Sequence, residues 1–118
     1  MNEMTEQMRQ RTKDLAVRVV RLYRALPESR DGQVIGMQLL RSGTSVGANY
    51  RAVCRARSKK DFVSKIGVVL EEADETVFWL ELLVETGVMP ESKLKSLLQE
   101  ARELTAIFTA AQRTSRSQ

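Results

Sequence analysis

The chain has 118 residues, which suits a single domain and is long enough to bury a core without disulfides or metals. It contains no histidine and one cysteine, Cys54, so the commonest metal ligand is absent and an intrachain disulfide is excluded. A lone cysteine fits a reducing compartment. The segment MNEMTEQMRQ is too polar for a signal peptide, and no apolar run approaches the ~20 residues that cross a membrane. We therefore expect a cytoplasmic protein with no metal, no cofactor and no membrane partner.

The net charge of +4 is unevenly distributed along the chain. Residues 1–60 carry 13 Lys and Arg against 5 Asp and Glu, a net charge of +8, whereas residues 61–118 carry 6 against 10, a net charge of −4. Such asymmetry can mark a polyanion-binding face. It can equally mean that the two halves pair electrostatically, within one subunit or between subunits.

The first two predicted helices cover residues 5–26 and 33–57. Apolar residues recur three and four positions apart in both, as the core face of a helix requires. In the first they are Leu15, Val19, Leu22 and Leu26, and in the second Ile35, Leu39, Gly43, Val46, Tyr50 and Val53. The segment LPESRDG, with its proline and glycine, separates the two helices.

The third and fourth predicted helices cover residues 59–86 and 91–113. Ser58 can cap the third, with Asp61 as the reciprocal acid, and Gly87 stands where a helix usually ends. Pro90 can open the fourth, because the N–H that proline lacks would be unpaired there. The apolar stripes are Phe62, Ile66, Val69, Ala73, Val77, Leu80 and Val84 in the third helix, and Leu94, Leu97, Ala101, Leu104, Phe108 and Ala111 in the fourth.

The pattern predicts an all-α fold. No segment alternates between apolar and polar residues over any length, so no strand is expected. Four amphipathic helices with short links form an antiparallel up-down four-helix bundle. We expect this bundle to occupy residues 1–118 as a single domain.

Three glycines, Gly36, Gly43 and Gly47, fall inside the second predicted helix, where each costs about 1 kcal/mol against alanine. We expect either close approach of a neighbouring helix or a local distortion to compensate. A phosphate-binding loop is excluded, because the G-x-x-x-x-G-K-[ST] order and a preceding strand are missing. Ser45 and Asn49, four positions apart, are expected to bond each other or the neighbouring backbone rather than to catalyse.

A set of cations surrounds the end of the second predicted helix. Arg51 and Arg55 are four residues apart and would share one face of that helix. No base-reading motif accompanies the cations, so contacts to the backbone and shape of RNA or DNA are predicted. The alternative is a solvated basic turn. The candidate nucleic-acid-binding residues are Arg41, Arg51, Arg55, Arg57, Lys59 and Lys60.

The third predicted helix carries more apolar residues than one core stripe needs. Phe78, Trp79 and Leu82 lie beside that stripe, which indicates an oligomer interface, since tryptophan is enriched at interface hot spots. The alternative is that Trp79 packs into its own core. The same helix carries acids that could pair with cations of the first two helices, within a subunit or across an interface: Glu71, Glu72, Asp74, Glu75, Glu81 and Glu85.

An enzyme is not expected. Helical bundles that hold two metal ions use Glu-x-x-His pairs, and this chain has no histidine. Neighbouring arginines could lower the pKa of Cys54, but that cysteine has no histidine partner to activate it.

The segment from Gln38 to Leu83 resembles the bacterial 23S rRNA intervening-sequence proteins, a family of four-helix bundles. The family pattern combines Q-L-x-R, S-[IV]-x-x-N-[IY], the basic junction R-S-x-x-[DE]-F and an L-E-L-L ending. The matching residues are Gln38, Leu39, Arg41, Ser45, Val46, Asn49, Tyr50, Arg57, Ser58, Asp61, Phe62 and Leu80 to Leu83. The chain departs from the commoner form at Gly47, where proline is frequent, and at Ala52, where glutamate is frequent, so any role of that glutamate is not carried over.

The resemblance implies a homo-oligomer, a pentamer of bundles arranged as a ring-like barrel. It also implies distant kinship with the accessory variability proteins of diversity-generating retroelements, which are basic pentameric bundles that engage nucleic acid and a reverse transcriptase. The biochemical function of the family itself is not established. Two hypotheses stay open: an oligomer that binds RNA or DNA, and a scaffold for an unidentified protein partner with no nucleic-acid role.

Overall fold

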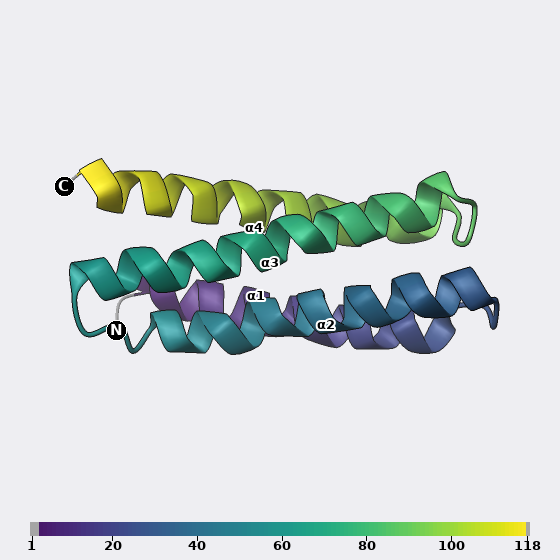
Figure 1. Cartoon of the computed structure of the whole chain (residues 1–118), viewed down its shortest axis with the longest axis horizontal. Helices are drawn as coiled ribbons and strands as arrows, with labels where there is room; N and C mark the ends of the chain where they lie inside the picture. The colour runs from purple at the N-terminus through teal and green to yellow at the C-terminus, as the bar shows by residue number, and fades with distance from the viewer. Residues whose placement is uncertain (1–2, 118) are drawn as a thin grey trace.

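The computed structural model describes residues 3–117, which form four helices and no strand. These are α1 (Glu3–Ala25), α2 (Arg30–Val53), α3 (Lys59–Glu85) and α4 (Glu91–Ser117). Successive helices run antiparallel in an elongated bundle of 46 × 21 × 21 Å (Figure 1). The α2–α3 turn lies at the same end as the start of α1 and the end of α4 (Figure 1). The predicted all-α fold of four helices is confirmed, and none of the described helices is long and apolar enough to span a membrane.

Capping side chains set several helix boundaries. Ser29 Oγ accepts a hydrogen bond from the N–H of Gly32 at 3.2 Å, so α2 begins three residues earlier than predicted. Ser58 caps α3 as predicted, through a 3.0 Å bond from the N–H of Asp61. Gly87 has a φ of +78° just beyond α3, the conformation for which glycine is favoured at a helix end. The fourth helix continues to Ser117, four residues beyond its predicted end.

The predicted extension of the second helix to residue 57 is wrong, because α2 ends at Val53. The N–H of Arg55 bonds a carbonyl three residues back, at 3.0 Å, so the chain tightens and leaves the helix. The backbone then becomes extended at Ser58, where α3 starts in the opposite direction. Arg55 and Arg57 therefore lie in the turn, and Arg55 does not share a helix face with Arg51.

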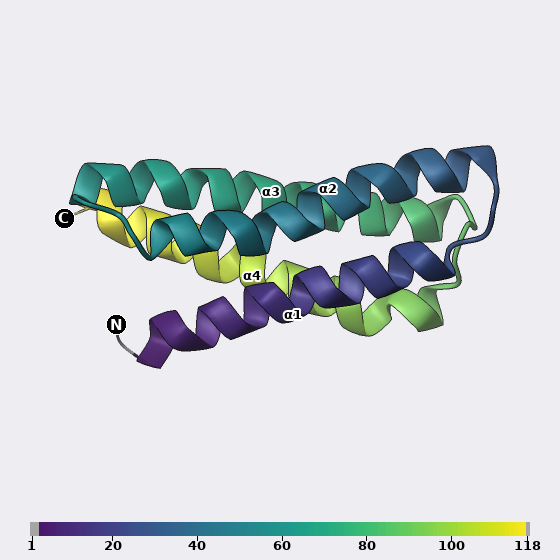
Figure 2. The same cartoon turned by 90° about the horizontal axis from the view of Figure 1, so that it is seen from below.

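Each helix packs along the next one in the chain, whereas α1 and α4 contact each other over a short stretch only. Figure 2 shows α1 diverging from α4 toward its N-terminal end. Helix α2 is thus flanked by α1 on one side and α3 on the other. The most completely buried large side chains come from all four helices and include Leu15, Val19, Leu39, Val46, Ile66, Leu80, Leu104 and Phe108.

The glycines of α2 face α1 at close range. A Cβ at Gly43 would lie 2.7 Å from a methyl carbon of Val19, and a Cβ at Gly47 would lie 3.0 Å from the carbonyl oxygen of Thr12. A side chain at either position would push the helices apart. Close approach of α1 therefore compensates for glycine inside α2. Of the two alternatives predicted from the sequence, this is the one that the structure confirms.

Candidate nucleic-acid interface

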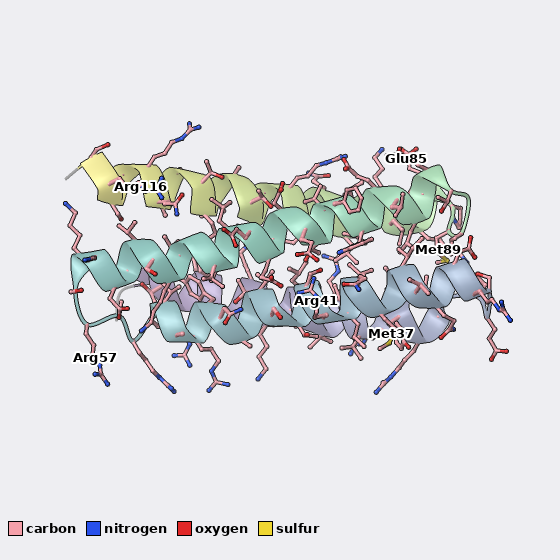
Figure 3. The ribbon with its side chains drawn as sticks, viewed as in Figure 1. Met37, Arg41, Arg57, Glu85, Met89 and Arg116 are labelled. Carbon is pink, nitrogen blue, oxygen red and sulfur yellow. The ribbon has the colours of Figure 1, made fainter. Side chains whose placement is uncertain are left out.

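Five cations gather at the end of the bundle where α2 turns into α3. We call them the basic end cluster: Arg51, Arg55, Arg57, Lys59 and Lys60. Arg51 stands in the last turn of α2, the next two lie in the turn, and the lysines open α3. All five residues are exposed. Figure 3 shows Arg57 pointing away from the helices into solvent.

No carboxylate within residues 5–117 forms an ion pair with the basic end cluster. Asp61 follows it in sequence, but this carboxylate accepts a 2.8 Å bond from Lys65 Nζ and a 3.1 Å bond from the backbone N–H of Arg57. These two bonds hold the pKa of Asp61 below its usual range, and the bond from Lys65 has the larger effect. The positive charge of the five side chains is therefore available to an external anion.

Arg41, the sixth predicted binding residue, lies apart from the other five. It stands midway along α2 on the side of α3 (Figure 3), where its guanidinium pairs with Glu72 at 3.1 Å and with Glu75. This is the pairing of second-helix cations with the acidic third helix that the charge distribution left open. The guanidinium donors of Arg41 are engaged inside the subunit, and the structure does not bring it together with the basic end cluster.

The predicted oligomer interface on α3 is partly exposed. Trp79 is half-buried against the core, and its indole N–H donates to Glu75 at 3.1 Å. Phe78 meets the Trp79 ring edge-on with centroids 4.9 Å apart, and it stays 51% exposed. Leu82 is half-buried, and Val34 on α2 is 64% exposed. Of the three predicted interface residues, Phe78 is therefore the most exposed, while Trp79 packs against its own core.

Sequence reasoning missed a buried polar pair between α2 and α3. The hydroxyl of Thr76 donates to Ser42 Oγ at 3.0 Å, and both side chains are fully buried. Serine and threonine at core positions of facing helices were the available signal. Ser45 and Asn49 are half-buried, and within the described residues no hydrogen bond joins them to each other.

Cys54 is not set up as a nucleophile. Burial raises the pKa of its thiol, and the nearby cations Arg9 and Arg55 oppose that effect without reversing it. The thiol therefore stays protonated at neutral pH, contrary to the lowering that neighbouring arginines suggested. Within the described residues, no group of three or more His, Cys, Asp or Glu could hold a metal ion.

Comparison with known proteins assigns the family. The family model of the 23S rRNA-intervening sequence protein matches residues 5–110. The chain belongs to this family. The match extends over all four helices, well beyond the 38–83 segment that carried the sequence resemblance. No curated protein matches the chain.

A solved structure agrees with this assignment. The chain is similar to a protein of unknown function from the S23 ribosomal protein family of Bacteroides thetaiotaomicron, with 34% sequence identity and a TM-score of 0.84. The similarity covers 92% of this chain and 97% of that one. The two proteins therefore share the bundle along almost their full length.

Proposed function

We propose that this family member is a cytoplasmic, non-enzymatic homo-oligomer that binds the backbone of structured RNA or DNA. The observation that carries the proposal is the basic end cluster, five exposed cations without a carboxylate partner in the described residues. Lysine and arginine bound to phosphates release condensed counterions, which gives affinity without sequence specificity. Such binding needs no histidine, cofactor or metal.

Oligomerisation would multiply this weak contact. A ring of subunits, with five as the favoured number, presents one basic end cluster per subunit, and linked sites gain affinity by effective concentration. The exposed ring of Phe78, flanked by Trp79 and Leu82, offers apolar surface for self-association. The elongated bundle would then direct all the basic ends toward the same face of the ring.

Fluorescence anisotropy with a labelled RNA hairpin and a labelled DNA duplex, at low and near-physiological salt, tests the proposal. We expect salt-sensitive binding by the wild type and its loss when Arg55, Lys59 and Lys60 are all changed to glutamate. The matched control changes Arg30, Lys93 and Lys95 to glutamate, which are exposed cations at the opposite end of the bundle. Equal loss in both triple variants, or no binding by the intact wild type, would reject the basic end cluster as the binding surface.

A protein-interaction scaffold is the second candidate, and the exposed apolar side chains of Phe78 and Val34 favour it. Phe78→Asp should lower the oligomer mass in light scattering, whereas Val17→Asp, an exposed apolar position on α1, should not. A wild type that assembles through Phe78 but binds neither RNA nor DNA would favour the scaffold, with the unidentified protein partner still to be found.

A further inference from the structure

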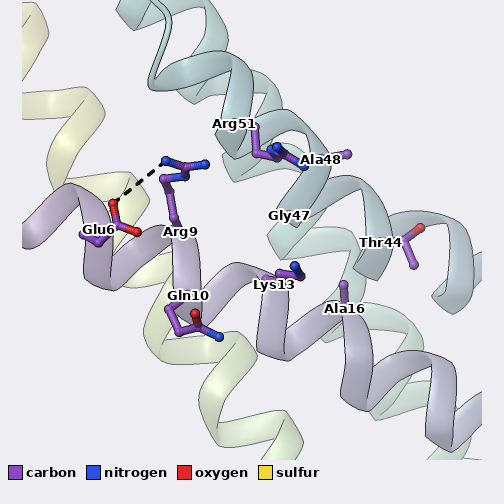
Figure 4. Close-up of a pocket in the computed structure, with 9 residues that line it drawn as sticks. All are labelled: Glu6, Arg9, Gln10, Lys13, Ala16, Thr44, Gly47, Ala48 and Arg51. Carbon is purple, nitrogen blue, oxygen red and sulfur yellow. Dashed lines mark ion pairs between the residues drawn. The ribbon is translucent and has the colours of Figure 1, made fainter. Parts of the chain in front are cut away.

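A groove of about 310 Å³ runs between α1 and α2, next to the basic end cluster. Small residues are part of its lining, among them Ala16, Gly47 and Ala48. Arg9 and Lys13 stand at its rim on α1 and Arg51 on α2, as Figure 4 shows. Arg51 belongs both to the groove and to the basic end cluster, so the two surfaces are continuous.

The groove is open because Gly47 has no side chain. The two helix backbones meet closely at this point, where a Cβ on Gly47 would lie 3.0 Å from the carbonyl oxygen of Thr12. The flanking Ala16 and Ala48 add only methyl groups, while the rim carries long cationic side chains. A shallow floor between such rims lets an anion reach the charged groups without displacing an apolar side chain.

The charge of the groove favours an anion. Among the described residues that line the groove, three are cations and one, Glu6, is a carboxylate, whose oxygen lies 3.9 Å from Arg9 Nη1 at a largely exposed position. Within the described residues, neither Lys13 nor Arg51 forms an ion pair. Arg9 and Lys13 are four residues apart, which places them about 6 Å apart along the helix axis.

We propose that the α1–α2 groove seats phosphate groups of a nucleic-acid backbone, as a second contact that extends the basic end cluster along the bundle. The inference rests on the proposed function and names residues, Lys13 and Arg51 above all, that would carry it. Arginine binds a phosphate in a planar fork and lysine as a compact charge, so the two rims complement each other. Each neutralised phosphate adds about 0.9 to the slope of log affinity against log salt.

The test compares matched variants by anisotropy with the labelled RNA hairpin over a series of salt concentrations. Lys13→Gln with Arg51→Gln should lower the affinity about tenfold and reduce the salt slope by about 2, whereas Lys93→Gln with Lys95→Gln should change neither. Ala48 offers a second pair at an exposed position of the groove: Ala48→Glu should weaken binding and Ala48→Lys should strengthen it. Thermal unfolding checks that all variants fold.

The outcomes separate the groove from the proposed function. If the wild type binds RNA and loses binding with the Arg55, Lys59 and Lys60 reversal, but the groove variants match their control, the groove inference is overturned and the proposed function stands. If the wild type binds no nucleic acid, both fail. If it instead sediments with phosphatidylserine vesicles and not with RNA, the groove serves a membrane surface and the inference is overturned.

Discussion

Helix α2 meets its two neighbours in different ways. Toward α1, glycines bring the backbones together, and Arg51 at the edge of that contact has no carboxylate partner in the described residues. Toward α3, the hydroxyls of Ser42 and Thr76 bond inside the core, and Arg41 at the edge is paired with carboxylates. Helix α2 therefore carries one arginine that is paired within the subunit, Arg41, and one that has no such partner in the described residues, Arg51.

The difference lies in the partner helix. The part of α3 that faces α2 supplies the acids Glu72 and Glu75, which neutralise Arg41. Helix α1 is rich in cations instead, so its positive charge adds to the positive charge of α2 where the two helices meet. The cations of α1 are Arg9, Arg11, Lys13, Arg18, Arg21 and Arg24. Positive charge without carboxylate partners in the described residues therefore extends to the edge between α1 and α2, and the density of cations in the sequence does not by itself locate it.

The largest effect on stability is expected where α2 packs against α1. Gly43→Leu should destabilise the bundle by at least about 2 kcal/mol, because overpacking outweighs the gain in helix propensity. Even the first carbon of the new side chain would lie 2.7 Å from Val19. Chemical denaturation followed by circular dichroism measures the change. Unaltered stability would contradict the close packing of α1 against α2 at Gly43.

Gly67 on α3 provides the control for that substitution. A Cβ there would meet only the end of the Gln112 side chain, at 2.8 Å, and this side chain can move. Gly67→Ala should therefore stabilise the bundle by up to about 1 kcal/mol through helix propensity. A loss as large as that of Gly43→Leu would show that any helical glycine is required, whatever its neighbour.

A smaller effect is expected on the α3 side. Thr76→Val keeps the shape of the side chain but removes the hydrogen bond to Ser42, at an expected cost of about 1 kcal/mol. Combining it with Ser42→Ala should cost less than the sum of the two single changes, because both remove the same bond. Strictly additive unfolding free energies would show that the two hydroxyls contribute independently.

The smallest effect concerns pH. Burial, and then the nearby charge of Cys54, raises the pKa of Tyr50 to about 12. A tyrosine in the unfolded chain titrates near about 10, so this group's contribution to stability is complete below that pH and lost as the pH rises through about 12. The melting temperature of the wild type should fall more steeply above pH ~10 than that of Tyr50→Phe. Parallel curves would contradict the burial of the phenol.

The sequence predicted four helices, because apolar period is a local pattern, and glycine spacing offered close helix approach as one of two explanations. It placed the end of the second helix at residue 57 instead of Val53. It could not predict which of Arg41 and Arg51 is available, since both are exposed arginines on one helix and their partners are distant in sequence. The Ser42–Thr76 bond joins residues 34 positions apart, so two hydroxyl residues at core positions hint at it but do not show that they meet. The groove could not be predicted for the same reason, because its rim residues come from two helices, α1 and α2.

The central claim is that α3 engages Arg41 while α1 leaves Arg51 available, and the two single variants Arg41→Gln and Arg51→Gln test it most directly. Both remove one positive charge from α2. Measured by anisotropy with the RNA hairpin across salt concentrations, Arg51→Gln should reduce the salt slope by about 1, and Arg41→Gln should leave it unchanged. Equal reductions in the two variants, or a larger one for Arg41→Gln, would contradict the account.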